Sequence, residues 1–469
     1  IAAPKITPIV TNRDSQSEVL SEIQTSQVQP IEPVFVDYKK DMSQFEAQPG
    51  IDVLYKKNET NDIFTLIYVF NTGTENDPAL NLAFNYLSYL GTDKMTAEEI
   101  ASEMYDIACS FYMNAGANQS SIQITGLSEN MGKAMEIVEG LIAGAKPDEA
   151  ILENCKADML KSRADAKLNQ SRCFGALQRY LFYGGDFIRR TTLTDPALQA
   201  LTSEQLLAKI GGLMGKQHEV LYYGPQKETE IKSALAEHHK VAADLQPLEK
   251  KFSTLLPTDA NKVVLAQYDA KQLYYLQFSN RGEKFDVAAD PEITLYNEYF
   301  GGGMNTIVFQ EMREARGLAY TAWATLATPS NANGDYSYYA FIATQNDKMQ
   351  KAVEAFDDII NNMPESEKAF GIAKEALVSR LRTERTVKDG VLWSYLRARD
   401  LCLDAPRDKQ IFEKVQSMTL DDVKAAQQKW VKGRKYVYGI LGDIQDLDLN
   451  YLKTLGPIQT VSQEEIFGY

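Results

Sequence analysis

The segment KAMEIVEGLI at residues 133–142 and the segment KAVEAFDDII at residues 351–360 decide the architecture of this 469-residue chain. Both segments begin with Lys-Ala, and both repeat apolar residues at the spacing of one helix face. The second starts 218 residues after the first. Self-similarity over such a distance predicts a duplicated unit rather than one large domain.

The neighbours of these two segments repeat in the same order along the chain. Three further pairs match at nearly the same offset, which no single match would establish. The pairs are Asp77-Pro78 with Leu82 and Tyr86 against Asp290-Pro291 with Leu295 and Tyr299; Leu160, Ser162 and Arg163 against Leu377, Ser379 and Arg380; and Gly224, ending EVLYYG, against Gly442, ending YVYGILG.

The local patterns within each copy mix strands and helices. IDVLYKK (51–57) and FTLIYVF (64–70) read as strands, and Thr96 with Glu99 forms a capping box that starts a helix. We therefore predict an α+β protein of two homologous domains, each a mixed, mainly antiparallel sheet packed with helices. The predicted divisions are a polar, Pro-containing linker or leader at 1–45, a first domain at 46–245 and a second at 246–469.

Composition excludes several classes of protein. The chain is 44% hydrophobic and carries a net charge of −15 without a stripe rich in Lys or Arg, so nucleic acid is a poor partner. Its apolar runs are too short for a membrane span. The four cysteines stand far apart with no C-x-x-C pair, so we expect buried thiols rather than a disulfide framework.

Histidine is too scarce for a histidine-based zinc site. The chain has only His218, His238 and His239, and neither H-E-x-x-H nor H-x-x-E-H can be written from them. We expect the adjacent pair His238-His239 to be solvated on a helix surface. None of the three has a nucleophile motif such as G-x-S-x-G nearby, which argues against a Ser-His-Asp hydrolase.

The segment GGGMNTIVFQEMREARGLAYTAWATLA at residues 301–327 is the most informative about function. We expect Asn305 to cap a helix that Gly317 ends, with a strand following from Leu318. Arg313 and Tyr320 would then flank one turn and could offer a guanidinium and a phenol to a carbonyl oxygen that gains negative charge. A structural cap or a surface pair would have the same spacing.

The glycine run at 301–303 does not indicate a nucleotide site. It lacks the G-K-[ST] of a phosphate loop and the G-x-G-x-x-G of a dinucleotide fold. A turn that ends a helix, or close approach of a peptide backbone, explains it better.

With these motifs in view, the chain resembles the pitrilysin/insulinase family of zinc metallopeptidases from Ile51 to about Asp443. The resemblance rests on R-x-x-x-x-G-L-x-Y, here Arg313 to Tyr320, after the glycine-rich turn. It implies that two homologous domains form one half of a clamshell around a peptide chamber. It also implies that Arg313 and Tyr320 reach across to the substrate carbonyl near the zinc of the other half.

The zinc motif of that family is missing from this chain. Members that bind zinc carry H-x-x-E-H about ten residues before a Gly-Thr, and the corresponding positions before Gly91-Thr92 are Leu82, Asn85 and Tyr86. Leucine cannot ligate a metal, and asparagine cannot replace a glutamate base. We therefore expect no metal or cofactor in this chain, zinc on a partner half that carries H-x-x-E-H, and no activity of the chain alone.

The resemblance thus predicts the zinc-less half of a metalloendopeptidase, joined to its zinc-bearing half in one longer chain or as a separate subunit, with a peptide as substrate. A non-catalytic scaffold or peptide-binding subunit of the same fold is the alternative. The compartment stays open, since a periplasmic and a cytoplasmic location both fit the sequence.

Overall fold

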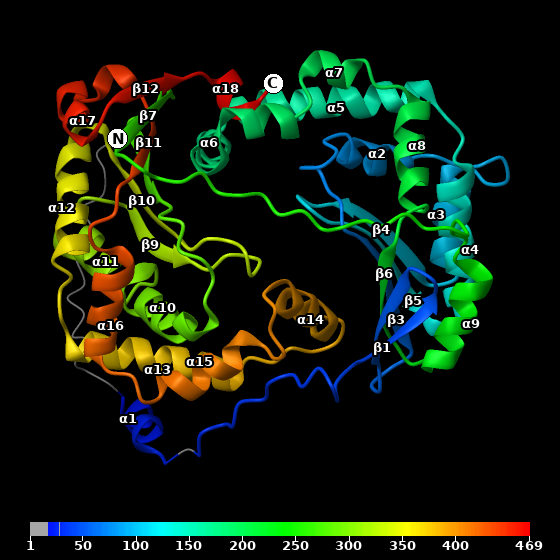
Figure 1. Cartoon of the computed structure of the whole chain (residues 1–469), viewed down its shortest axis with the longest axis horizontal. Coiled ribbons are helices and arrows are strands. Elements are labelled where there is room, and N and C mark those ends of the chain that lie inside the picture. The colour runs from blue at the N-terminus through cyan, green and yellow to red at the C-terminus, as the bar shows by residue number, and fades with distance from the viewer. Residues whose placement is uncertain (1–16, 28) are drawn as a thin grey trace.

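The chain is built around two six-stranded sheets. A computed structural model describes residues 17–27 and 29–469. The strand order is β1-β2-β6-β3-β5-β4 in the first sheet and β12-β7-β11-β8-β10-β9 in the second. We call the segment from β1 to α9 the first half and the segment from β7 to α18 the second half. Figure 1 shows the two sheets on opposite sides of the molecule.

The strands have similar lengths in the two sheets. Those of the first sheet are β1 (Ser43–Gln48), β2 (Ile51–Lys57), β3 (Ile63–Phe70), β4 (Cys109–Ala115), β5 (Ser120–Leu127) and β6 (His218–Gly224). Those of the second are β7 (Lys262–Gln267), β8 (Gln272–Ser279), β9 (Thr321–Ala327), β10 (Ser337–Gln345), β11 (Val437–Gly442) and β12 (Ile458–Val461).

Both sheets pair their strands in the same way apart from one edge. β2 runs parallel to β6 as β7 does to β11, and the remaining central pairs are antiparallel. The added edge strand differs, because β1 is antiparallel to β2 whereas β12 is parallel to β7. The predicted α+β class with two mixed, mainly antiparallel sheets is confirmed.

Helices cover the sheets in a corresponding order. α1 (Glu18–Thr25) precedes the first half, whose helices are α2 (Leu80–Leu87), α3 (Ala97–Asp106), α4 (Met131–Gly144), α5 (Glu149–Lys167), α6 (Gln170–Thr191), α7 (Asp195–Gln199), α8 (Ser203–Leu213) and α9 (Glu228–His238). The second half has α10 (Asp290–Tyr296), α11 (Ile307–Phe309), α12 (Met349–Asn361), α13 (Glu367–Thr383), α14 (Gly390–Asp400), α15 (Arg407–Val415), α16 (Leu420–Ala426), α17 (Leu449–Leu455) and α18 (Gln463–Phe467).

Several local predictions hold in detail. β2 spans the predicted 51–57, and the capping box of Thr96 with Glu99 starts α3. The repeated segments lie in α4 and α12. The aspartate of each repeated Asp-Pro pair binds a basic side chain on a later helix: Asp77 binds Lys209 at 2.5 Å, and Asp290 binds Arg407 at 2.5 and 2.8 Å.

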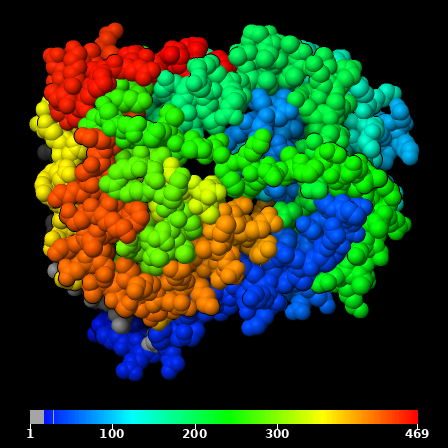
Figure 2. Space-filling view, in the orientation of Figure 1, coloured from blue at the N-terminus to red at the C-terminus, as the bar shows by residue number. Residues whose placement is uncertain are grey.

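One long helix from each half packs on the sheet of the other half. α6 of the first half contributes Cys173, Phe174, Leu177 and Leu181 to a cluster with β7, β8 and β11. α14 of the second half contributes Val391, Leu392 and Leu396 to a cluster with β2, β3 and β6. Figure 2 shows the orange α14 region against the blue strands of the first sheet. Because of this exchange, each half completes the core of the other.

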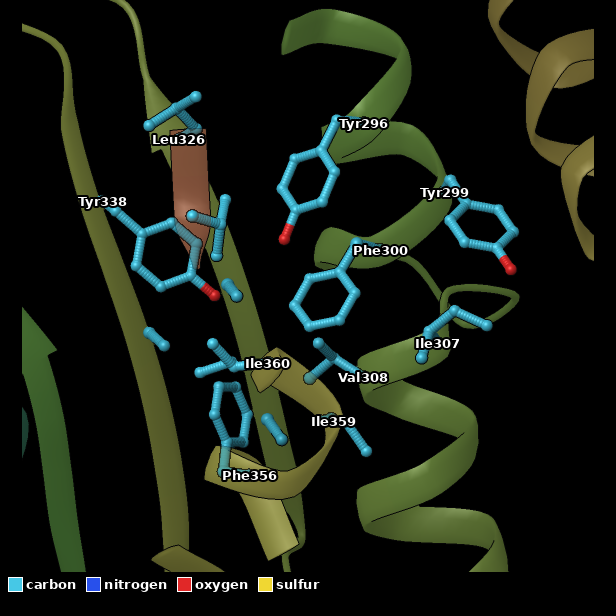
Figure 3. Packing of buried hydrophobic residues seen from close by; sticks show 14 of the residues in the cluster. Tyr296, Tyr299, Phe300, Ile307, Val308, Leu326, Tyr338, Phe356, Ile359 and Ile360 are labelled. Carbon is cyan, nitrogen blue, oxygen red and sulfur yellow. The ribbon is translucent and has the colours of Figure 1, made fainter. Parts of the chain in front are cut away.

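The core of the second half is rich in aromatic side chains. Figure 3 shows Tyr296 and Tyr338 directed toward one another beside Phe300, whereas Tyr299 points away from them. Tyr296, Tyr338 and Phe300 are each at most 1% exposed. Their rings supply much of the buried apolar area that holds α10 on the sheet.

The segment predicted as a linker at 1–45 lies partly outside the described residues, at 1–16 and 28. Its described end is held by both halves. The Phe35 ring lies 5.9 Å from the Phe412 ring, the Tyr38 hydroxyl bonds Ser394 at 2.8 Å, and β1 already begins at Ser43. Across residues 17–27 and 29–469, no helix combines the length and hydrophobicity needed to span a membrane.

The cysteine prediction is right at three positions and wrong at one. Cys109, Cys155 and Cys173 are buried thiols, but Cys402 is exposed. Cys402 follows the end of α14 with a backbone φ of +57°, in a turn that leaves the helix rather than on its packed face.

Candidate functional site

Arg313 and Tyr320 lie on either side of a tight reversal before the edge strand β9. The helix lies one residue later in the chain than predicted. It starts after Thr306 rather than Asn305, and its last turn, Gln310–Ala315, is π-helical. Gly317 makes the reversal with a φ of +57°, a conformation that favours glycine. The strand begins at Thr321, three residues later than predicted.

The reversal brings the two side chains into contact. The guanidinium carbon of Arg313 lies 5.1 Å from the centre of the Tyr320 ring and 5.0 Å from that of Phe309. A cation over two aromatic faces is held in orientation while its N–H groups stay free in the plane of the guanidinium. The geometry therefore joins Arg313, Tyr320 and Phe309 in one cluster.

Both polar ends of this cluster are open to solvent. The Tyr320 side chain is 71% exposed and that of Arg313 is 43% exposed. Among the described residues, the one ion pair of Arg313 is a long contact of 3.7 Å from Nε to Glu314. Tyr320 is anchored by its backbone instead, since its N–H donates to the carbonyl of Ala343 at 3.1 Å. The side chains remain available to a ligand.

The three positions that correspond to a zinc motif lie on α2. Leu82 and Tyr86 are four residues apart and share the buried face of the helix, where both are 0% exposed, while Asn85 is on the exposed face. The Tyr86 hydroxyl donates to Ser203 Oγ and accepts from the N–H of Asp148, both at 2.8 Å. A leucine, an outward asparagine and a fully bonded tyrosine do not fit a zinc ion.

Tyr86 has a structural counterpart in the second half. The hydroxyl of Tyr299 donates to the carbonyl of Pro364 at 2.8 Å and accepts from the N–H of Ser366 at 3.1 Å. Ser366 is the N-cap of α13, as Asp148 is of α5. The sequence marked Tyr86 as a lost ligand and as the match of Tyr299, but it did not predict the hydrogen bonds of either hydroxyl. Its match to Tyr299 in the repeat was the signal that both tyrosines tie a short helix to the start of a long one.

Histidines form a buried chain that the sequence did not reveal. The prediction of a solvated His238-His239 pair is wrong, because His239 is buried and binds Glu139 at 2.5 Å through Nδ1. Its Nε2 lies 2.9 Å from Nε2 of His218, whose Nδ1 is 2.7 Å from the carbonyl of Lys216. α9 ends at His238, and His239 follows it in an extended conformation that places its side chain in the core.

The hydrogen-bonded series Glu139, His239 and His218 is part of the core and not a metal centre. Burial, and then the neighbouring His239, lower the pKa of His218 to about 3. In the described part of the chain, no group of three or more His, Cys, Asp or Glu side chains is placed to hold a metal ion.

Comparison by sequence finds similarity to a peptidase family. Residues 217–377 match the model described as the peptidase M16 inactive domain. An uncharacterized zinc protease of Streptomyces coelicolor is 21% identical over 392 residues, which are 79% of this chain and 82% of the relative. One from Rickettsia felis is 24% identical over 312 residues, covering 63% of this chain and 71% of the relative.

Comparison by structure gives the same fold. The peptidase M16 inactive domain from Pseudomonas fluorescens superposes with a TM-score of 0.67 at 18% identity, over 86% of this chain and 98% of that one. The ferredoxin protease FusC, solved with Arabidopsis ferredoxin, matches with a TM-score of 0.67 at 14% identity, over 94% of this chain but only 48% of FusC. The periplasmic protease PqqL of Escherichia coli matches over 94% of this chain and 49% of its own, with a TM-score of 0.65 at 13% identity. The resemblance to this family is confirmed.

Proposed function

From the premise that residues 217–377 carry the inactive domain of the M16 zinc peptidases, we propose that this chain is the zinc-less half of a metalloendopeptidase. It completes a peptide chamber with a half that carries H-x-x-E-H and supplies Arg313 and Tyr320 to the substrate carbonyl. The chain covers about half of the length of FusC and of PqqL. This supports an arrangement in which a further, zinc-bearing half of the enzyme accompanies the whole of this chain.

The observation that carries the proposal is the exposed cluster of Arg313 and Tyr320. Two donors of different shape, one cationic, are exposed at a turn next to an edge strand. A peptide carbonyl becomes negatively charged in the transition state of hydrolysis, and donors held in place before the reaction stabilise that charge. The zinc half supplies the metal-activated water, and this chain supplies binding and charge stabilisation.

A scaffold of the same fold would not need this cluster. A structural arginine is normally held by a carboxylate or by backbone carbonyls, as Arg434 is by Glu283 and the carbonyl of Trp430. Arg313 lies over two rings, and among the described residues its one ion pair is the long contact with Glu314. This contrast within one molecule favours the catalytic half over the non-catalytic alternative.

The proposal is tested by zinc content and by reconstitution. We expect the purified chain to hold far less than one zinc ion per molecule and to leave a quenched fluorescent peptide uncleaved. Mixed with a zinc-bearing half from the same source, identified by its H-x-x-E-H motif, it should give zinc-dependent cleavage that neither protein shows alone.

Two results would contradict this function. One is a tightly bound, stoichiometric zinc in the chain alone, measured by elemental analysis after dialysis against a chelator. The other is cleavage by the zinc-bearing half that is unchanged when this chain is omitted. A chain whose exposed Cys402 is replaced by Ser serves as the control for adventitious metal binding by a thiol.

A further inference from the structure

A cavity of about 490 Å³ lies where the turn between β9 and β10 meets the segment that links the two halves. We call residues 239–261, between α9 and β7, the joining segment. Residues 182–183 of α6, 252–255 of the joining segment and 327–335 of the turn line the cavity. Figure 1 shows the yellow-green turn between β9 and β10 reaching toward α14 in the middle of the molecule. The volume is in the range of ligand sites.

The walls of this cavity are held by main-chain hydrogen bonds. The N–H of Leu256 donates to the carbonyl of Phe182 at 2.8 Å, which ties the joining segment to α6. The N–H of Ala332 donates to the carbonyl of Asp400 at 2.9 Å, which ties the turn to the end of α14. The cavity is therefore formed before a ligand enters, so little ordering has to accompany binding.

The lining of the cavity favours a cation. Of the described residues that line it, Asp335 alone is charged. The other lining side chains are neutral, and four of them are aromatic: Phe182, Tyr183, Phe252 and Tyr339. Aromatic faces attract cations and also pack against the aliphatic stem of a long basic side chain. One carboxylate among aromatic rings therefore suits an ammonium or guanidinium on an apolar stem.

The carboxylate of Asp335 is buried but incompletely bonded. Its side chain is 9% exposed, and Oδ2 accepts from the side-chain amide of Asn280 at 3.2 Å. Oδ1 accepts no hydrogen bond from the described residues, although Nζ of Lys284 lies 2.7 Å away as an ion pair. The same ammonium donates to the carbonyl of Asn333, another lining residue, at 3.0 Å. Because the Lys284 side chain is 63% exposed, this ammonium is held weakly and can be exchanged.

We propose that this cavity binds the side chain of a lysine or arginine in a peptide, whose charge replaces Lys284 at Asp335. The stem of the bound side chain packs against the aromatic walls, and its N–H groups satisfy Oδ1. The inference rests on the proposed function in that the peptide is the substrate.

The position of the cavity along β9 predicts where the basic residue lies in the substrate. Tyr320 precedes the first residue of β9, and the cavity begins at the last, Ala327. The seven residues of β9 span roughly 20 Å, which an extended peptide covers in about six residues. The lysine or arginine is therefore expected about six positions from the cleaved bond.

Calorimetric titration of the whole chain at low salt tests the recognition. The probe is an acetylated and amidated pentapeptide with one lysine between alanines. Replacing this lysine by norleucine, which keeps the stem without the charge, should weaken binding about tenfold or more. Equal binding of the two peptides would overturn the inference. Free L-lysine should bind at least about tenfold more weakly, because it lacks the main chain on either side, and binding equal to that of the peptide would overturn the assignment to a peptide.

Two variants should change the affinity in opposite directions. Asp335→Asn keeps the shape and an acceptor for Asn280 but removes the charge, and should weaken binding of the lysine peptide about tenfold. Lys284→Met removes the competing ammonium and should strengthen binding about two- to fivefold, since an exposed ion pair contributes little. Asp259→Asn removes an exposed charge outside the lining and is the matched control.

A purely structural pair of Asp335 and Lys284 predicts a different result. Both variants would then lower the melting temperature, and neither would change the affinity for the peptide, which would overturn the inference. If Asp335→Asn does not fold, Lys284→Met decides by itself, because unchanged or weaker binding to that variant would refute competition for the carboxylate.

The reconstituted enzyme measures the spacing. A single lysine moved along a substrate should lower KM most, by about tenfold, when it lies five to seven residues from the cleaved bond, with kcat nearly unchanged. A KM that does not depend on lysine position would overturn the placement. Lysine-selective binding without cleavage in any mixture would remove only the proposed function, whereas cleavage that depends on this chain without lysine selectivity in the titration would remove only the inference.

Discussion

α4 of the first half and α12 of the second each direct one carboxylate toward the sheet, but the two carboxylates have different partners. Glu139 and Asp357 occupy the seventh position of the repeated segment. Glu139 binds Nδ1 of His239 and also accepts from the N–H of Lys240 at 3.2 Å. Asp357 lies near several tyrosines, and among the described residues no basic side chain lowers its pKa.

The chemical consequence follows from the partners. Burial raises the pKa of Asp357 to about 6, and the nearby Gln277 amide opposes this only in part. Six residues before the glycine that ends the strand, the first half has His218 and the second has Tyr436. The first half therefore has a buried base beside its acid, and the second has a partly buried acid among phenols.

The difference shows what duplication preserved in this chain. The order of the five corresponding strands, an ion pair of the aspartate in each Asp-Pro pair, and the hydrogen-bonded tyrosines at 86 and 299 occur in both halves. The polar groups inside the two cores diverged, because any arrangement that satisfies a buried carboxylate supports the same fold.

The largest effect is expected from removing the better-partnered carboxylate. Glu139→Leu leaves His239 and the N–H of Lys240 without an acceptor in a buried site, and should lower the free energy of unfolding by about 3–5 kcal/mol. Asp357→Asn removes a carboxylate that burial disfavours, and should be neutral or stabilising by about 1–2 kcal/mol at pH 7. Denaturant unfolding of both variants measures this, and losses of equal size would show that the two sites are equivalent.

An intermediate effect of similar size in both halves is expected for the paired tyrosines. Tyr86→Phe and Tyr299→Phe each remove a hydroxyl that accepts the N–H of the N-cap residue of a long helix. Each should cost about 1–3 kcal/mol, because the freed N–H is poorly solvated. Tyr112→Phe, at an exposed position, is the matched control. A loss confined to Tyr299→Phe would contradict the structural role given to Tyr86.

The smallest net effect is expected from acid between pH 6 and 4. His218 has a lower pKa folded than unfolded, so its contribution to stability is present above about pH 6.5 and is lost as pH falls toward 3. Asp357 has a raised pKa, so its contribution is present at low pH and is lost as pH rises through 6. Each changes stability by at most about 1.4 kcal/mol per pH unit, in opposite directions.

Asp357→Asn separates these two contributions. Its stability relative to the unmodified chain should fall as pH is lowered from 7 to 4, since the gain from removing a strained carboxylate disappears once that carboxylate is protonated. Unfolding free energies at four pH values between 4 and 7 measure this difference. A difference independent of pH would show that Asp357 does not titrate in this range.

The sequence predicted the framework well because the framework depends on periodicity. Hydrophobic spacing located β2, α3 and α4, and the Asp-Pro and glycine matches revealed the duplication. The site was only partly predictable. The pairing of Arg313 with Tyr320 could be expected from a tight turn, but the added stacking on Phe309 depends on a π-helical turn, which no sequence pattern indicated.

The buried features escaped prediction for a related reason. His239 lies one residue past the end of α9, and whether such a residue faces water or the core is set by where the chain goes next. The exchange of α6 and α14 between the halves is a tertiary event that segment-by-segment reading cannot supply.

The central claim is that this chain acts on the substrate carbonyl through Arg313 and Tyr320. The most direct measurement is kcat and kcat/KM of the reconstituted enzyme with Tyr320→Phe, beside a thermal unfolding curve of the same preparation. We predict that both kinetic constants fall together by about 10²–10³, with KM and the melting temperature nearly unchanged. Turnover close to that of the unmodified enzyme would contradict the account and favour a non-catalytic half.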